Sequence, residues 1–238
     1  MAAARGRGPV RLAVWLLAVV AVAAVVAAFG VPAVLASRLE AVLRDDLGGG
    51  RVSVHVRGAP WRLLAGRLSV LEIEARGAEV NQLRAERIFL RLGDVRVPLG
   101  PLFREGTLNV HSASGGEGQI TLTRENVEQY LSRSKGVARP TVAMEEGLLT
   151  IEGDVRVGEL DLRARIVGRL VIASPRTVDL HVQELTVSGV EIPREVGALL
   201  VASFNPLINL EGLPVPARVS SVATEGGQVT MMVRVDAQ

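Results

Sequence analysis

The sequence predicts an α+β protein that is mostly β, in which a long curved antiparallel sheet wraps around helices and follows an N-terminal transmembrane or signal helix. Three observations predict this class: an uncharged apolar stretch near the start, period-two alternation of apolar and polar residues through most of the remainder, and few stretches with helical spacing. The 238 residues therefore divide into an N-terminal cytoplasmic tail with an anchor or signal segment, residues 1–37, and an exported domain, residues 38–238.

The N-terminal segment has the length and flanking charges of a membrane span. Leu12–Ser37 is 26 residues without a charge, whereas an α-helix needs about 20 apolar residues to cross a bilayer. Arg5, Arg7 and Arg11 precede it, which predicts a cytoplasmic N-terminus. A cleaved signal peptide is the alternative, because residues 34–36 (Val-Leu-Ala) resemble a cleavage site. We expect a single-pass protein of the cell membrane, or a secreted protein if the segment is cleaved.

The distribution of charge argues against nucleic-acid binding. The chain has 27 basic and 25 acidic residues, and removing the three arginines of the tail leaves 24 basic residues against 25 acidic ones. An almost neutral domain has no excess of basic residues to spare for a nucleic-acid surface, and an aromatic content of 3% leaves few side chains for base stacking. The absence of cysteine excludes disulfides, thiolate zinc sites and cysteine nucleophiles.

An amphipathic helix is predicted directly after the apolar segment. Its apolar residues stand at helical spacing, and Gly48–Gly50 ends the pattern. These apolar residues are Leu39, Val42, Leu43 and Leu47. We expect the helix to pack on the sheet that follows, and the alternative is a free helix at the membrane surface.

Alternation with a period of two predicts the strands. The alternating stretches are residues 52–56, 68–75, 88–92, 108–110, 120–122, 149–157, 160–172, 178–187, 219–222 and 229–235. One wet and one buried face is antiparallel behaviour. The stretch 160–172 would extend about 43 Å as a strand. The alternation changes phase between Val70 and Leu71 and again between Val182 and Leu185, which predicts a bulge or bend at each place.

The remaining elements are two helices, a hairpin and a loop. Thr123 is a suitable N-cap for a helix over Arg124–Ser132, and Pro193 suits the first turn of a helix over Arg194–Phe204. Gly226 and Gly227 predict a hairpin turn between the last two strands. The glycine-rich residues 115–118 predict a flexible hairpin loop rather than a phosphate-binding loop, because a strand and not a helix follows them.

A long sheet with one apolar face needs a cover, and three modest helices are all that the sequence offers. A strongly curved sheet wrapped around these helices would close the surface and can leave a slot lined by Val, Leu and Ala, which suits acyl chains. A fully packed core without a slot is the alternative. The candidate lining residues, for each of which ordinary core packing is the alternative role, are Val42, Leu43, Val127, Leu131, Leu199, Leu200 and Phe204.

Catalytic and metal-binding motifs are missing. His55, His111 and His181 stand on the polar side of alternating stretches, without the spacing of metal ligands. The sequence contains no nucleophile elbow, P-loop or calcium loop. We therefore assign no catalytic residue, no metal ligand and no cofactor, and we expect a protein that is not an enzyme. A hydrolase of envelope lipids, with a triad assembled from distant residues, is a rival interpretation.

Four segments in order resemble a known family. They are Gly58–Gly66 with its G-x-P element, Leu90–Phe103, the strand and helix of Gln119–Leu131, and residues 205–216 with Asn-Pro-Leu and Leu-Pro-Val-Pro. Together they are similar to the LmeA-like phospholipid-binding family of bacterial envelope proteins, over roughly residues 38–236.

This resemblance implies a curved sheet around a long helix, as in the tubular lipid-binding (BPI-like) superfamily, and phospholipid binding without catalysis. We expect a membrane-tethered or secreted envelope protein that binds phospholipid acyl chains in an apolar slot, for lipid transfer or envelope glycolipid maintenance. Its expected partners are a phospholipid or related envelope lipid and the membrane, and no nucleic acid. The alternative is a non-enzymatic envelope scaffold that pairs with partners through exposed sheet edges.

Overall fold

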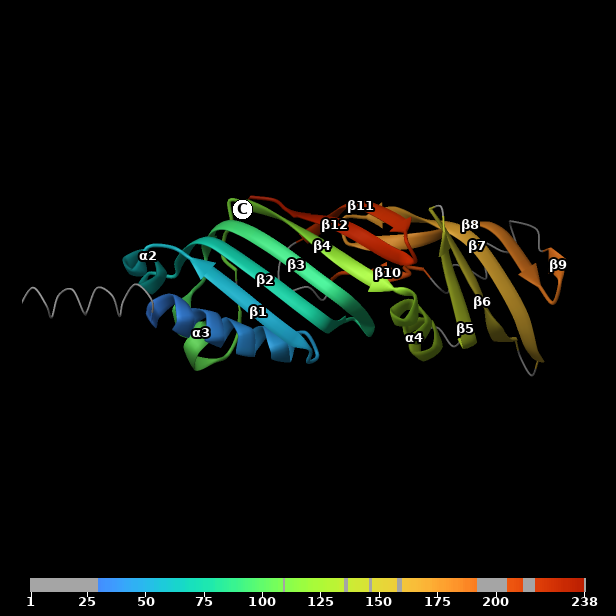
Figure 1. Ribbon diagram of the computed structural model, residues 1–238, viewed down its shortest axis with the longest axis horizontal. Coiled ribbons are helices and arrows are strands. Elements are labelled where there is room, and N and C mark those ends of the chain that lie inside the picture. The colour runs from blue at the N-terminus through green and yellow to red at the C-terminus, as the bar shows by residue number, and fades with distance from the viewer. Residues whose placement is uncertain are drawn as a thin grey trace, which may run out of the picture.

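The computed structural model describes residues 30–108, 110–134, 137–145, 147–157, 160–191, 205–211 and 217–237. Most of these residues are in strands, which form two antiparallel sheets that lie end to end along an elongated molecule (Figure 1). The mostly β, antiparallel class predicted from the sequence is therefore confirmed. The prediction of one long sheet is wrong, because the chain leaves the first sheet after β4 and returns to it only with β11 and β12.

The first sheet contains strands from both ends of the chain. Its order is β1 (Arg51–Arg57), β2 (Arg67–Val80), β3 (Leu83–Arg96), β4 (Gly115–Thr123), β12 (Gln228–Val235) and β11 (Ala217–Glu225). Gly226 and Gly227, both with positive φ, form the predicted turn between β11 and β12. This hairpin pairs with β4 along its whole length, so the last residues of the domain complete the first sheet.

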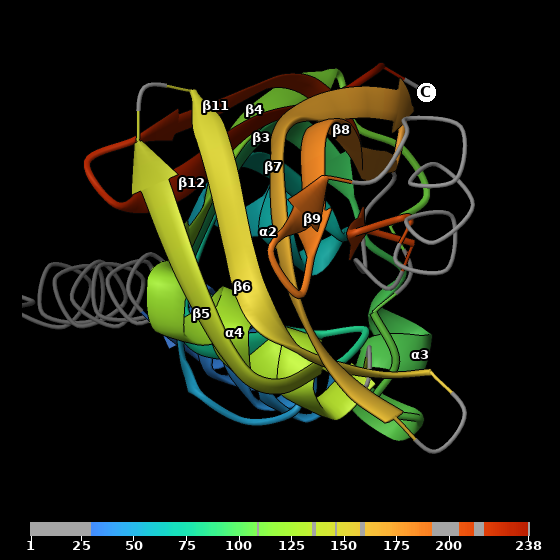
Figure 2. The same cartoon turned by 90° about the vertical axis from the view of Figure 1, so that its right-hand side faces the viewer.

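The second sheet is a meander whose strands curl around the interior (Figure 2). Its order is β10 (Ile208–Asn209), β8 (Thr177–Val187), β7 (Leu160–Ser174), β6 (Leu148–Val157) and β5 (Val137–Glu145), and β9 (Val190–Glu191) pairs with β8. The predicted phase change in β8 is a bulge, because Val167 pairs with Glu184 whereas Gly168 pairs with Val182. The alternation does not predict β5, which contains a proline and an irregular register. The short strand predicted at residues 108–110 is wrong, because Leu108 and Val110 lie outside the described strands.

The helix over residues 30–46 packs beneath the first sheet, as expected. Its predicted apolar stripe is buried, with at most 4% of any of the four side chains exposed. The Glu40 carboxylate accepts a hydrogen bond from the Val54 amide of β1 at 2.8 Å, and the Leu47 carbonyl accepts one from Glu79 of β2 at 2.9 Å. The helix therefore belongs to the folded domain, and a free helix at the membrane surface is excluded for this stretch.

β2 and β3 bend together instead of forming a bulge. Leu68 and Leu71 are both buried although their odd separation would put them on opposite faces of a regular strand. The register with β3 is the same on both sides of this point, since Leu68 pairs with Val95 and Leu71 with Leu92. Asp94, which lies between these partners, has a positive φ of 41°. The predicted phase change is therefore a bend shared by two strands, which keeps their apolar side chains on the curved inner face.

Residues 115–118 lie in β4, so the prediction of a flexible hairpin loop is wrong. A Cβ atom at Gly116 would lie 2.6 Å from the Arg91 carbonyl oxygen, and one at Gly118 would lie 2.5 Å from the Phe89 carbonyl oxygen. Glycine is needed here because β4 lies close between β3 and β12. Local sequence suggests a loop because glycine disfavours isolated strands, whereas pairing on both sides stabilises this one.

The sequence does not predict the two short helices, and α4 is the second predicted helix that the structure confirms. α2 (Pro60–Leu64) and α3 (Leu99–Arg104) are too short to show helical periodicity in the sequence. α4 (Arg124–Ser134) begins at the predicted N-cap, where the Thr123 hydroxyl accepts from the Asn126 amide and the Asn126 side chain accepts from the Thr123 amide. The predicted helix over Arg194–Phe204 lies outside the described residues.

Most of the predicted membrane segment, residues 12–29, also lies outside the described residues. Residues 30–37, its last part, are helical and continue into the helix that ends at residue 46. Among the described residues, no helix combines the length and the apolar character that crossing a membrane requires. The anchor, its cleavage and the location of the protein stay predictions.

Candidate functional site

One continuous apolar cluster fills the interior of both sheets. It extends from Leu35 in the N-terminal helix to Val235 in the last strand and includes inward-facing residues of both sheets. The two sheets are also joined through their backbones, because the Val219 amide donates to the Pro175 carbonyl at 2.7 Å. An elongated apolar interior of this kind is the main candidate for a functional site.

A small apolar cavity lies in this interior, between α4 and the second sheet. Its lining contains no charged or polar side chain. The lining residues, from α4, β5, β6, β7, β8 and the segment before β10, are Leu131, Val137, Ile151, Gly153, Ala164, Ile166, Leu180 and Leu207. Its volume is about 10 Å³, close to the space of one water molecule. The structure therefore shows a closed apolar contact and not an open slot. We call this contact, where α4 and the segment 205–211 meet the second sheet around the cavity, the seam.

Small residues account for the position of this cavity. Gly153 of β6 pairs directly with Ala164 of β7, so the two strands present almost no side-chain volume at this point. A Cβ at Gly153 would lie 2.4 Å from Cγ1 of Val137, which shows how closely β5 and β6 approach. The space remains where larger side chains from α4 and the segment 205–211 meet this pair of small residues.

The Asn205 side chain holds the segment 205–211 against β8. Its Oδ1 accepts a hydrogen bond from the Leu180 amide at 2.9 Å, and its Nδ2 donates to the Leu180 carbonyl at 3.2 Å. These two bonds imitate a short stretch of strand pairing, which Ile208 continues by pairing with Val178. As a result, Leu207 is buried at the cavity.

The apolar face of the second sheet is less completely covered than that of the first. Leu170, Val182 and Val187 are only partly buried, and 40% of Ile172 is exposed. Ile172 pairs directly with Val178, which is fully buried. The boundary between exposed and buried apolar side chains therefore lies between β7 and β8 at this end of the strand pair. Leu170 pairs directly with Leu180, which lines the cavity, so a partly exposed apolar residue adjoins the cavity lining.

The predicted lining residues fall into three groups. Leu131 lines the cavity, and Val127 is buried on the same helix. Val42 and Leu43 are buried beneath the first sheet, in the other half of the molecule. The remaining three, Leu199, Leu200 and Phe204, lie outside the described residues.

The cavity residues contributed by strands were not predicted as lining. The signal was present, because Ile151, Ala164, Ile166 and Leu180 all belong to the apolar side of alternating stretches. Alternation shows which face is buried but not which buried residues meet α4, because this depends on strand order and curvature.

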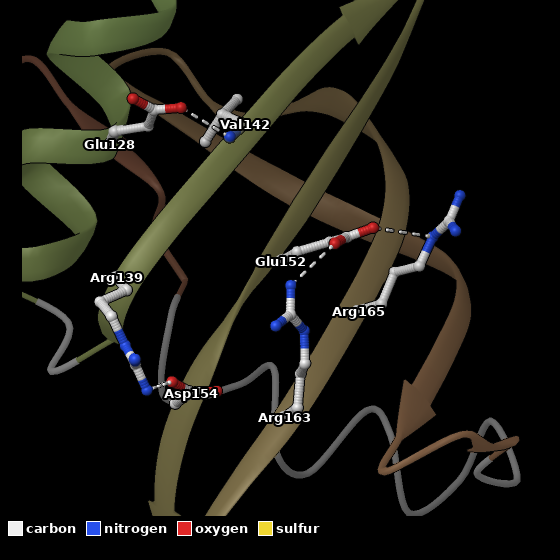
Figure 3. A network of polar contacts seen from close by, with 7 residues as sticks. All are labelled: Glu128, Arg139, Val142, Glu152, Asp154, Arg163 and Arg165. Atoms are coloured by element: carbon white, nitrogen blue, oxygen red, sulfur yellow. Dashed lines mark hydrogen bonds and ion pairs between the residues drawn. The ribbon is translucent and has the colours of Figure 1, made fainter.

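Polar groups lie on the outer face of the second sheet (Figure 3). Glu152 forms ion pairs with Arg163 and Arg165, both at 3.6 Å, and Asp154 pairs with Arg139. His55, His111 and His181 are exposed, and within the described ranges no group of acidic or histidine side chains is arranged to hold a metal ion. The outer pairs resemble surface cross-strand pairs, which add modest stability and no evident chemistry.

The one phenol of the chain fits an apolar interior. Tyr130 of α4 is 9% exposed, and burial raises the pKa of its hydroxyl above the ordinary value. The group is therefore neutral at physiological pH, and α4 presents no charge from this position to the core.

Comparison with known proteins gives one match. The model of a family described as LmeA-like phospholipid-binding matches residues 26–234. No curated protein and no solved structure shows significant similarity to the chain.

Proposed function

Because the chain belongs to the LmeA-like phospholipid-binding family, we propose that it is a membrane-tethered envelope protein that holds phospholipid acyl chains between α4 and the second sheet. The observation that carries this proposal is the entirely apolar lining of the seam at that place. A segment cleaved after the apolar stretch would make the same domain a secreted lipid carrier.

Acyl chains would enter by parting α4 and the segment 205–211 from the sheet, because the seam is closed without ligand. Each buried methylene contributes about 0.8 kcal/mol, so about ten methylenes supply about 8 kcal/mol toward this opening. The partly exposed residues Leu170, Val182 and Val187 form an apolar approach to the seam. No charged side chain lines the cavity, so the headgroup would stay at its mouth.

The mechanism proposed is passive. The histidines are exposed, and Glu152 is on the outer face of the sheet in ion pairs with two arginines. Glu128 of α4 accepts a hydrogen bond from the Val142 amide. Binding and release of lipid then depend on apolar burial alone, without a covalent step. Such a protein would serve lipid transfer or the maintenance of envelope glycolipids.

A scaffold that recruits partners through its sheet edges has less support. At one edge of each sheet, formed by β1 and β5, a glutamate already accepts a hydrogen bond from an edge amide, Glu40 from Val54 and Glu128 from Val142, both at 2.8 Å. Occupied edge amides hinder the addition of a further strand.

The direct test is to find the lipid. The full-length protein is purified, and its organic extract is examined by mass spectrometry for co-purifying phospholipid. Uptake of a phospholipid with a fluorescent acyl chain is measured in parallel. Protein that is free of lipid and also fails to take up the fluorescent phospholipid would contradict the proposal.

A pair of variants locates the binding site. Ala164→Leu fills the seam from the inner face of β7, so uptake is expected to fall about tenfold, equivalent to losing about 1.4 kcal/mol of binding. Ala143→Leu makes the same change on the exposed face of β5 in the same sheet, and uptake should stay unchanged. Circular dichroism and thermal unfolding confirm that both variants are folded. Equal uptake by both folded variants would rule out the seam as the binding site.

A further inference from the structure

Four large apolar side chains are exposed at one end of the molecule. They come from three separate segments, and their exposed fractions are 57% for Val34, 74% for Trp61, 63% for Leu64 and 43% for Phe103. Figure 1 shows α2 and the beginning of the described N-terminal helix at the same end. Side chains of this size are rarely left exposed together on a surface that has only solvent to meet.

Buried side chains and backbone hydrogen bonds fix these three segments to the core and to one another. Leu63 of α2 and Leu102 of α3 are completely buried and fasten the two short helices to the core. The Val97 amide donates to the Gly66 carbonyl at 2.8 Å, which joins the end of α2 to the chain that enters α3. The Arg38 guanidinium donates to the Phe103 carbonyl at 3.3 Å, which joins α3 to the N-terminal helix. The exposed residues therefore form one supported surface, the apolar end, defined as Val34, α2 and α3.

A basic groove lies beside the apolar end. It has a volume of about 500 Å³, and its charged lining consists of Arg62, Arg67 and Arg96 against the single acid Asp94. Arg62 is 3.6 Å from Asp94, so the two other arginines give the groove an excess of positive charge. The hydroxyls of two serines complete a lining that suits phosphate oxygens.

The position of the apolar segment identifies the occupant. The uncharged residues 12–37 lead directly into the helix that begins at this end, and they have the length of a bilayer span. A bilayer that receives this segment would meet the apolar end first. Exposed Trp, Leu and Phe beside arginines are the side chains that settle at the headgroup level of membranes.

We propose that the apolar end and its basic groove form a docking surface for an anionic lipid bilayer. Trp61, Leu64 and Phe103 enter the interface, while Arg67 and Arg96 face lipid phosphates. The domain then stands with its long axis away from the membrane, and the second sheet is its distal part. This surface is separate from the proposed lipid seam. The proposal rests on the membrane tether of the proposed function, but not on lipid binding in the seam.

The experiment compares two matched positions in the full-length chain, reconstituted into vesicles of phosphatidylcholine with or without phosphatidylglycerol. The chain has no cysteine, so a single introduced cysteine carries the only fluorescent label. Leu64→Cys places the label on the apolar end, and Val190→Cys places it at the other end with the same exposure, 64% against 63%. The label at position 64 is expected to shift to the blue and to be quenched by spin-labelled lipid, whereas the label at position 190 is not.

Charge variants test the preference for anionic lipid. Arg67→Gln/Arg96→Gln should reduce the ratio of docked to undocked protein in phosphatidylglycerol vesicles by about fivefold per arginine. Arg44→Gln/Arg51→Gln removes the same charge from exposed positions outside this groove and should change little. Equal quenching in both charge variants would overturn the role of the groove.

Two results would overturn the docking surface as a whole. One is a label at position 64 that behaves like the label at position 190 in both kinds of vesicle. The other is a blue shift that appears without vesicles and grows with protein concentration, which would assign the surface to a second copy of the chain. Ala164→Leu should leave the label at position 64 unchanged, so failure of the lipid seam and failure of docking are distinguished.

Discussion

In each half of the molecule, a helix is followed by an edge strand whose backbone bonds to that helix. In the first half, the Val54 amide of β1 donates to Glu40, and in the second half the Val142 amide of β5 donates to Glu128. Both bonds are 2.8 Å long, and both join residues fourteen positions apart. In each case the carboxylate accepts a hydrogen bond from a backbone amide that an edge strand would otherwise expose to water. The bond also fixes the orientation of the strand relative to the helix.

The two halves differ in how completely the helix fills the sheet. In the first half, inner residues such as Leu71, Ile73 and Leu92 are at most 2% exposed above a helix described over residues 30–46. In the second half, the eleven-residue α4 leaves apolar residues partly exposed and a cavity at Gly153. Each half thus has a helix packed against a curved sheet. The long helix closes the core of the first half, whereas the short α4 leaves the core of the second half incompletely closed.

The first comparison of the halves uses one substitution beneath each sheet. Leu43→Ala removes a side chain that is 1% exposed in the sealed half, and we expect the free energy of unfolding to fall by about 3 kcal/mol. Leu131→Ala is expected to cost about 2 kcal/mol, because Leu131 already borders empty space and has fewer contacts to lose. Urea unfolding measures both. Added phospholipid should restore stability to the Leu131 variant only, and restoration of the Leu43 variant would mean that the halves do not differ in this way.

The second comparison adds one methyl group to a strand of each sheet. At Gly118 the new Cβ meets the Phe89 carbonyl oxygen at 2.5 Å, and backbone cannot move aside, so Gly118→Ala should cost about 2 kcal/mol. At Gly153 the nearest atom is the tip of the Val137 side chain, which can rotate, so Gly153→Ala should cost about 1 kcal/mol. Thermal unfolding measures the two costs, and Gly100→Ala is the control because no atom lies within 4 Å of its Cβ. A larger cost at Gly153 would show that the second sheet is the more rigid one.

The third comparison tests whether the two edge bonds are equivalent. Glu40→Ala and Glu128→Ala each remove a carboxylate that accepts from an edge amide, and each is expected to cost about 1 kcal/mol. The double variant should lose the sum to within about 0.5 kcal/mol, because the two bonds are in different halves. Denaturant unfolding of the three variants gives the coupling. Strong coupling would mean that the halves open as one unit.

The smallest expected effect concerns the charged outer face. The hydrogen bond from Arg76, together with the charge of Arg87, lowers the pKa of Glu74 below its ordinary value of 4.5, against an opposing effect of burial. The stability from this group is therefore complete above pH 4.5 and is lost as the pH falls through the lowered pKa of the folded state. Glu74→Gln should cost about 0.5 kcal/mol at pH 7 and nothing at strongly acidic pH.

The control for this pH dependence is in the second half. Glu152→Gln removes ion pairs that are 3.6 Å long, compared with 3.0 and 3.1 Å at Glu74, so its cost at pH 7 should be smaller (Figure 3). Stability is measured by urea unfolding from pH 7 downward. A cost of Glu74→Gln that does not change with pH would contradict the assignment to the ionised carboxylate.

Features that depend on neighbours along the chain are predicted correctly from the sequence. Features that depend on pairing with a distant strand are not. The stripe of Leu39 and Leu43, the cap at Thr123 and the alternation of β7 depend on neighbours along the chain, and all three are present in the structure. The glycines of β4 were assigned to a loop, because their strand exists only through β3 and β12 on either side. For the candidate site, the sequence predicts Leu131 as a lining residue but not Ala164.

The sequence by itself determined the class of the fold, the buried face of the strands that alternate clearly and the apolar stretch that precedes the domain. These features follow from residue spacing and from side-chain hydrophobicity, which are properties of the chain before it folds. Only the tertiary structure decided that the strands form two sheets and that the small residues Gly153 and Ala164 face each other beneath α4. Strand order and curvature bring together residues from distant parts of the sequence, and no local pattern records which of them will meet.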